Sequence, residues 1–203
     1  MNYRAVGRLC AVSITDFNLP ISQEETLTLL TEGGFKIVNR DLIAMARECV
    51  GTSLYRRSAR LRESPSVVNC SQFTRWLFSH IGVWLPRRAI EQRDNGAGVL
   101  LTSSEFVCAG DLVFSNGRDA YYHDRPGDGV GHVGIATADA SVVCASRKAG
   151  GVHEVSLAEF YKDGFRGVRR VMMPGTLTFL TPQEAEIETS NDVGWWLRER
   201  LPK

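Results

Sequence analysis

The stretch that decides the fold is VNCSQFTRWLFSHIG, residues 68–82. Its apolar residues follow the i, i+3, i+4, i+8 spacing of one helical face at Phe73, Trp76, Leu77 and Ile81. The spacing predicts a helix over residues 70–81, which Gly82 ends. Asn69 is a good N-cap residue, so we expect Cys70 in the first turn of this helix.

Cys70 is the first candidate for chemistry. A helix N-terminus carries about half a positive charge and free backbone N–H groups, and both favour a thiolate over a thiol. We therefore expect a lowered pKa for Cys70, and we expect the same N–H groups to hold the oxyanion of an acyl-transfer intermediate. The alternative is a small buried core residue, which is what most cysteines are.

Length and composition limit the possible classes of protein. The chain has 203 residues, 43% of them apolar and 23% charged, as in a globular protein of one domain with extensions or of two small domains. The net charge of +1 argues against a nucleic-acid binder with a broad basic surface. No apolar run approaches the roughly 18 residues of a membrane helix, and we find no secretory signal. We expect a cytoplasmic protein without a membrane partner, with specialised export as the alternative.

The cysteines form no disulfide or metal pattern. There are five, at Cys10, Cys49, Cys70, Cys108 and Cys144. The number is odd, the spacing is wide and no CxxC pair occurs, so we expect neither a disulfide framework nor a zinc ribbon. A zinc site of Cys70, His132 and Cys144 would have an open position but lacks the close ligand spacing of usual zinc motifs. We expect no metal and no cofactor, and we assign no oligomeric state.

Short strand patterns begin after residue 110. Glycine and aspartate clusters separate five of them, at Asp111–Ser115, His132–Thr137, Ser141–Ala145, Val152–Ser156 and Val168–Met172. Helix patterns before residue 110 and strand patterns after it predict an α+β fold, in which an antiparallel sheet packs on the Cys70 helix. Upstream, Ser22 with Glu25 predicts a capping box, and Asp41 predicts the N-cap of a second helix.

A cysteine nucleophile needs a base, which can be remote in sequence. The chain has four histidines, His80, His123, His132 and His153. His80 would lie about 15 Å from Cys70 by helical rise, which is too far. His123 belongs to a polar loop, whereas His132 begins a strand among glycines that allow close backbone approach. His132 is therefore the candidate base, and a structural strand histidine is the alternative.

The third member of such a site orients the imidazole. A hairpin with an odd-numbered loop around Asp139 would put His132 and Cys144 on the same side of the sheet, whereas a two-residue loop would not. Residues 138–141 lack the Asn-Gly type of pair that two-residue loops favour, so we expect the odd loop.

Five segments, taken in order, resemble the NlpC-type cysteine peptidases. They are VNCSQF (68–73), GVWLPR (82–87) with Gln92, AGDLVF (109–114), GHVGI (131–135), and VVCAS (142–146) with residues 151–152. The resemblance covers residues 40–172 and implies a papain-like domain over residues 40–174, with extensions over residues 1–39 and 175–203. Members of this family mostly cleave amide bonds in bacterial cell-wall peptides, often between D-glutamate and a diamino acid.

The resemblance also implies roles for single residues. Cys70 is the implied nucleophile and His132 the implied base. The third catalytic position falls twelve residues after His132, on Cys144. Tyr55 stands where the family has a tyrosine near the active site.

We place Tyr55, Arg56 and Gln92 at the substrate-binding site. Arg56 belongs to an arginine-rich loop, which could bind the carboxylates of an acidic peptide or could be a solvated loop. Two departures from the family pattern lie beside the nucleophile. Asn69 replaces the usual Asp and caps a helix about as well, and Gln72 replaces a small residue.

Cys144 is the main departure, because the family usually has His, Asn or Gln at this position. A thiol is only a weak acceptor, so neutral Cys144 would orient His132 poorly. Three readings stay open. The third member is weak or substituted, for example by His153 or Asp128; a Cys70–Cys144 disulfide gates the enzyme by oxidation; or the scaffold binds without catalysis.

We therefore expect a thiol-dependent amidase or peptidase that cleaves small, cell-wall-derived peptides through a Cys–His acyl-enzyme mechanism. Its partner would be a small peptide substrate. The alternative is a catalytically impaired or non-catalytic peptide-binding module on the same fold.

Overall fold

The computed structural model describes residues 1–116 and 129–201, and the chain divides into two compact units. The central unit comprises residues 41–77 and 85–172. The terminal unit comprises residues 1–40, 78–84 and 173–203.

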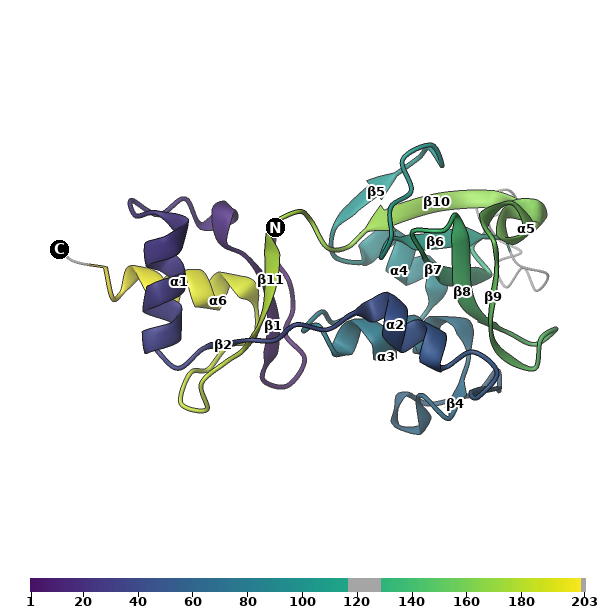
Figure 1. Ribbon diagram of the computed structural model, residues 1–203, viewed down its shortest axis with the longest axis horizontal. Coiled ribbons are helices and arrows are strands. Elements are labelled where there is room, and N and C mark those ends of the chain that lie inside the picture. The colour runs from purple at the N-terminus through teal and green to yellow at the C-terminus, as the bar shows by residue number, and fades with distance from the viewer. Residues whose placement is uncertain (117–128, 202–203) are drawn as a thin grey trace. The chain divides into compact units, whose positions relative to one another are not determined.

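The central unit is built on an eight-stranded sheet in the order β4-β3-β9-β8-β7-β6-β10-β5 (Figure 1). The strands are β3 (Leu54–Tyr55), β4 (Val67–Val68), β5 (Val99–Leu101), β6 (Leu112–Ser115), β7 (His132–Ala136), β8 (Ser141–Ser146), β9 (Gly151–Ser156) and β10 (Phe165–Arg170). Neighbouring strands pair antiparallel except β3 and β4, which pair parallel. The predicted α+β fold is confirmed, and the predicted antiparallel sheet differs only at the parallel β3–β4 pair.

Helices flank this sheet. They are α2 (Leu42–Glu48), α3 (Cys70–Ser79), α4 (Ala89–Asn95) and α5 (Leu157–Phe160), with the 3₁₀ turns η2 (Leu61–Glu63) and η3 (Tyr161–Asp163). Helix α4 contacts β6 and β10, and α5 contacts β8 and β9 (Figure 1). The short α5–η3 segment therefore lies beside the strands that carry Cys144 and His153.

Helices α2 and α3 begin where the local sequence predicts. The Asp41 side chain accepts hydrogen bonds from two first-turn N–H groups of α2, both at 2.9 Å. Asn69 Oδ1 accepts from the Gln72 N–H at 2.9 Å, and its Nδ2 donates to the Arg57 carbonyl at 2.8 Å. Asn69 thus caps α3 and also ties the start of the helix to the preceding loop. Helix α3 ends at Ser79, two residues before its predicted end. Gly82 lies beyond it with a φ of +70°, a conformation that favours glycine.

The β7–β8 hairpin has the predicted odd loop. Gly134 pairs with Cys144, and the Thr137 N–H donates to the Ser141 carbonyl at 2.9 Å. Three residues are left in the loop. Because facing residues of an antiparallel pair point to the same side, His132 and Cys144 lie on one side of the sheet, as predicted.

Strand β10 differs from its predicted range of Val168–Met172. It begins at Phe165, and its pairing with β6 is irregular between Phe165 and Val168. Gly167 lies in this interval with a φ of +106°. A glycine in this conformation breaks the alternation of the strand, so the first half carries no strand pattern in the sequence.

A buried apolar cluster fills part of the central unit. Its members are Val113, Ala136, Val142, Cys144, Phe160 and Val168. Cys144 is only 1% exposed. The Cys144 side chain is therefore part of the packed core of the central unit.

The terminal unit combines both ends of the chain. Strands β1 (Leu9–Ser13), β11 (Thr176–Leu180) and β2 (Lys36–Ile37) form an antiparallel sheet in the order β1-β11-β2. The remaining elements are α1 (Gln23–Glu32), α6 (Ser190–Arg198) and the 3₁₀ turn η1 (Ile14–Phe17). The two segments expected as separate extensions thus pair strand to strand and share one core, which includes Phe35, Phe179 and Leu197.

Local signals are confirmed in this unit as well. The Glu25 N–H donates to Ser22 Oγ at 3.1 Å, and the Ser22 N–H donates to the Glu25 carboxylate at 2.8 Å. This is the reciprocal capping box that the sequence predicts.

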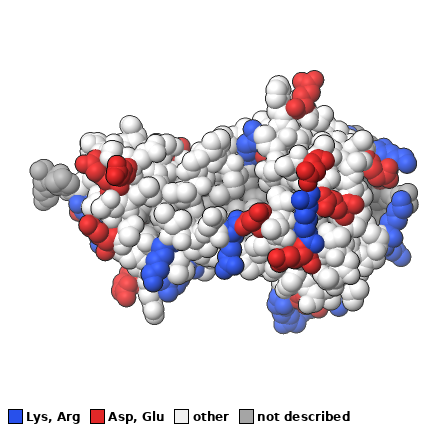
Figure 2. All heavy atoms as spheres, in the orientation of Figure 1, with Lys and Arg blue, Asp and Glu red and all other residues white. Residues whose placement is uncertain are grey.

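Surface charge is mixed. On the face of the described residues that Figure 2 shows, acidic and basic side chains are interspersed. Among the described residues, no helix combines the length and the apolar character that crossing a bilayer requires.

Candidate active site

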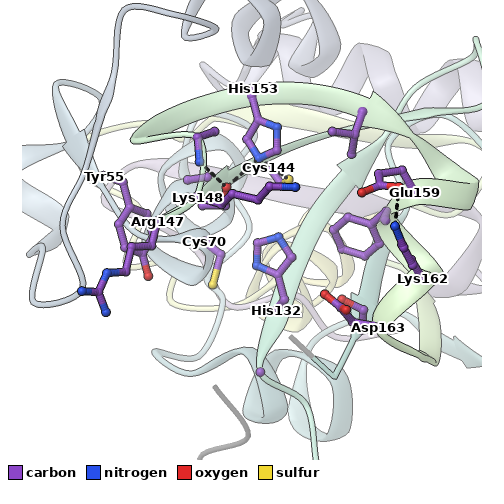
Figure 3. A pocket seen from close by; sticks show the side chains of 17 residues that line it. Tyr55, Cys70, His132, Cys144, Arg147, Lys148, His153, Glu159, Lys162 and Asp163 are labelled. Carbon is purple, nitrogen blue, oxygen red and sulfur yellow. Dashed lines mark hydrogen bonds and ion pairs between the residues drawn. The ribbon is translucent and has the colours of Figure 1, made fainter. Parts of the chain in front are cut away.

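The predicted catalytic residues line one cavity of the central unit, which has a volume of about 770 Å³. Cys70, His132 and Cys144 all contribute to its wall, together with Tyr55 (Figure 3). Cys70 comes from the start of α3, His132 from β7 and Cys144 from β8. The sheet and one helix terminus therefore bring together side chains that are far apart in the sequence.

Cys70 is the first residue of α3. Burial is the largest effect on its thiol and raises the pKa above the ordinary 9.0, whereas the backbone N–H groups of Val133, Ser71 and Cys70 lower it, as does the Arg87 guanidinium. The expectation of a lowered pKa is wrong for the free protein, because tertiary burial outweighs the helix terminus. The N–H groups nevertheless lie at the sulfur, where an oxyanion would form.

His132 is a partly buried imidazole with a lowered pKa. Burial, and after it the neighbouring His153, lowers its pKa from 6.5 to about 4, and Asp163 acts in the opposite direction. The ring stacks on Phe160, with centroids 5.1 Å apart and an interplanar angle of 27°. At neutral pH His132 therefore carries a lone pair on one ring nitrogen, and the stacking restricts its orientation.

Cys144 faces His153 across the β8–β9 pair. The His153 Nε2 atom is 3.5 Å from Cys144 Sγ and 2.9 Å from Ser146 Oγ. Burial raises the pKa of Cys144 far above its usual range, and Cys70 adds to this effect. Cys144 is therefore a neutral thiol with a histidine behind it.

His153 and Asp128 are the two possible substitutes for the third position. His153 lines the cavity, and burial and then Lys148 lower its pKa. Asp128 lies outside the described residues, as does His123. Cys70 and Cys144 are free thiols in this structure.

The three residues assigned to substrate binding have different surroundings. Tyr55 lines the cavity. Arg56 lies outside the described lining of the cavity and forms an ion pair with Glu63. Gln92 is fully buried, accepts from Thr74 Oγ1 at 2.8 Å and donates to the carbonyls of Ser71 and Pro86 at 2.9 and 3.0 Å. The structure therefore brings Tyr55, but not Arg56 or Gln92, to the described wall of the cavity.

Sequence reasoning missed the charged part of this wall. Arg147 and Lys148 come from the turn between β8 and β9, and Glu159, Lys162 and Asp163 come from α5 and η3. The available signal was the sequence RKAG at 147–150, a basic turn between two strand patterns. Among residues 1–116 and 129–201, no group of three or more His, Cys, Asp or Glu side chains is arranged to hold a metal ion.

A family model described as the NlpC/P60 family matches residues 58–170. A search of curated proteins gives no significant match to the chain.

Solved structures match over about two thirds of the chain. An NlpC/P60 family protein from Bacillus cereus is 26% identical with a TM-score of 0.53, and the match covers 66% of this chain and 40% of that one. A protein similar to a lipoprotein of the NLP/P60 family from Staphylococcus aureus is 25% identical with a TM-score of 0.50, covering 68% and 44%.

NlpC2 from Trichomonas vaginalis is 18% identical with a TM-score of 0.55, covering 65% of this chain and 45% of that one. At this identity the similarity shows the fold alone. The chain thus spans less than half the length of these solved structures.

Proposed function

The chain belongs to the NlpC/P60 family, and from this premise we propose that it is a thiol-dependent amidase for small cell-wall-derived peptides of the D-glutamyl–diamino acid type. Members of the family are generally cysteine peptidases. The observation that carries the proposal is a single cavity lined by both Cys70, at a helix start, and His132, whose lowered pKa keeps it neutral.

In the proposed mechanism, Cys70 Sγ attacks the scissile carbonyl carbon while His132 takes the thiol proton as general base. The backbone N–H groups near the sulfur, including that of Ser71, stabilise the tetrahedral oxyanion. His132 then gives its proton to the departing amine, leaving an acyl group on Cys70. Water, deprotonated by His132, releases the acyl group as a carboxylate.

The timing of proton transfer follows from the two pKa shifts. Burial keeps Cys70 protonated, and it also keeps His132 neutral. The resting pair is therefore thiol and imidazole, and the proton moves during attack. An open site with a stronger field from the helix terminus would favour a preformed thiolate–imidazolium pair instead.

We assign the third position to Cys144 together with His153. Neutral Cys144 can accept only weakly from an imidazole N–H. His153 and Ser146 form a hydrogen-bonding row behind it at 3.5 and 2.9 Å, which supports the orientation of the sulfur. Catalysis with Cys144 as the third residue should be slower than with a strong hydrogen-bond acceptor. A strong acceptor is not required, because stacking on Phe160 also orients the His132 ring.

The alternative function is a peptide-binding module, and the buried neutral thiol at position 144 favours it. Turnover distinguishes the two. The protein is incubated with γ-D-glutamyl-L-lysine, and release of lysine is followed by chromatography. The proposal predicts turnover that Cys70→Ala lowers about a thousandfold or more.

The matched control is Cys108→Ser, which changes an exposed cysteine outside the described cavity lining. It should turn over at the rate of the unchanged protein. Binding of the peptide without release of lysine would favour the binding module. Release that survives in Cys70→Ala would refute the proposed mechanism.

A further inference from the structure

Two cations on the β8–β9 turn line the cavity. Arg147 and Lys148 are both exposed, and together they form the basic turn. Figure 3 shows Arg147 on the Tyr55 side of the cavity and Lys148 on the side of Cys144 and His153. Lys148 also contributes to lowering the pKa of His153, so its charge acts on the interior of the cavity.

The backbone of the basic turn is held in place. The Gly150 N–H donates to the Arg147 carbonyl at 3.2 Å, and Gly150 has a φ of +73°. The Ala149 N–H donates to Ser146 Oγ at 3.2 Å, and the Gly150 carbonyl accepts from the Tyr55 N–H at 2.8 Å. Both cations therefore extend from a fixed support, which reduces the entropy lost when a ligand binds them.

The charge of the basic turn is not neutralised within the described part of the chain. There, neither Arg147 nor Lys148 forms an ion pair, whereas Lys162 has Glu159 at 3.9 Å and Arg47 has two acidic partners. The cavity acids lie on α5 and η3, so the basic turn gives its own part of the wall a positive charge.

We propose that the basic turn binds a carboxylate of the peptide substrate. The inference rests on the proposed function, since it assigns the chemistry of the ligand in the same cavity. A guanidinium and an ammonium on adjacent residues suit a carboxylate, through charge-assisted hydrogen bonds from Arg147 and a point charge from Lys148. The carboxylate has two possible sources, the α-carboxylate of the D-glutamyl residue and the terminal carboxylate of the diamino acid.

Binding to the Cys70→Ala protein tests the proposal without turnover. The probes are γ-D-glutamyl-L-lysine and its two mono-amidated forms, one with a D-glutamyl α-carboxamide and one with a C-terminal carboxamide, titrated by calorimetry. Amidation at the recognised position should weaken binding about tenfold, in the range of a hydrogen bond to a charged group. The position that shows the loss identifies the source of the carboxylate.

The double variant Arg147→Gln, Lys148→Gln should bind all three peptides with nearly equal affinity. Arg62→Gln, which removes an exposed cation outside the described lining, is the control and should keep the preference. Higher salt should reduce the preference, because the cations are exposed. Equal binding of the three peptides by the Cys70→Ala protein, or a preference retained in the double variant, would overturn the proposal.

Turnover separates this proposal from the proposed function. If the otherwise unchanged protein cleaves all three peptides equally well through Cys70, the amidase function stands and the carboxylate site does not. If the carboxylate preference appears in binding while no peptide is cleaved, the carboxylate site stands and the amidase function does not.

Discussion

Alkylation of Cys70 should depend steeply on pH, because its thiol is protonated in the resting protein. The pKa lies above 9.0 through burial. At pH 6 a thiol of this kind is about 0.1% thiolate or less, and the fraction rises about tenfold for each pH unit below its pKa. The rate constant for iodoacetamide should therefore rise about a thousandfold between pH 6 and pH 9, without a plateau.

The assay compares cysteines within one protein. Samples are alkylated for short times at each pH, quenched with acid, digested and mapped by mass spectrometry. Cys108 is the internal reference, since it is exposed. At pH 6 Cys108 should be labelled before Cys70, whereas Cys10, Cys49 and Cys144 are buried and should react slowly.

His132→Gln is the matched variant. If the proton moves only during attack on substrate, this change should leave the alkylation profile of Cys70 nearly unaltered while it abolishes amide turnover. A preformed thiolate–imidazolium pair gives the opposite pattern, with rapid labelling of Cys70 from pH 5 to pH 8 that the variant removes. That pattern would refute the reasoning from burial.

Three further predictions follow from single contacts. The acid limb of kcat/KM should titrate near pH 4, because activity requires neutral His132 and burial lowers its pKa to about 4; a limb at pH 6.5 in the rate profile would contradict this. Gln92→Leu should lower the free energy of unfolding in urea by about 2–4 kcal/mol, because the Thr74 hydroxyl and the Ser71 and Pro86 carbonyls each lose a hydrogen bond to Gln92. An unchanged urea midpoint would show that these three groups form other hydrogen bonds in the variant. Gly134→Ala should cost about 1–3 kcal/mol in the same measurement, because its Cβ would lie 2.4 Å from a Val142 methyl carbon and 3.0 Å from Cys144 Cβ; wild-type stability would show that the sheet opens without cost.

Local features of the fold could be predicted from the sequence. The cap at Asn69, the α3 helix and the odd loop of the β7–β8 hairpin depend on residues within a few positions of one another. Pairing of β1 with β11 joins residues about 170 positions apart. The residue pattern of neither strand indicates which other strand it pairs with. Helix α4 was missed because its N-cap residue is Arg88, a type that seldom caps a helix. The Glu91 carboxylate accepts a hydrogen bond from the Arg88 N–H there.

The site was predictable to a similar degree. The pairing of Cys70 with His132 followed from a helix start, a strand start and the family resemblance, and both residues line the cavity. The direction of the Cys70 pKa was not predictable, because burial depends on the whole sheet. The surroundings of Arg56 and Gln92 were also set by tertiary contacts, an ion pair with Glu63 in the first case and buried hydrogen bonds in the second.

Trapping the acyl-enzyme tests the central claim most directly. The protein is mixed with an activated γ-D-glutamyl ester, quenched with acid within seconds, and examined by intact mass and by peptide mapping. The account predicts one γ-D-glutamyl group on Cys70, which Cys70→Ala lacks and which is lost as free glutamate forms. Glutamate release with Cys70 unmodified, or an acyl group held on Cys108 or Cys144 instead, would contradict the account.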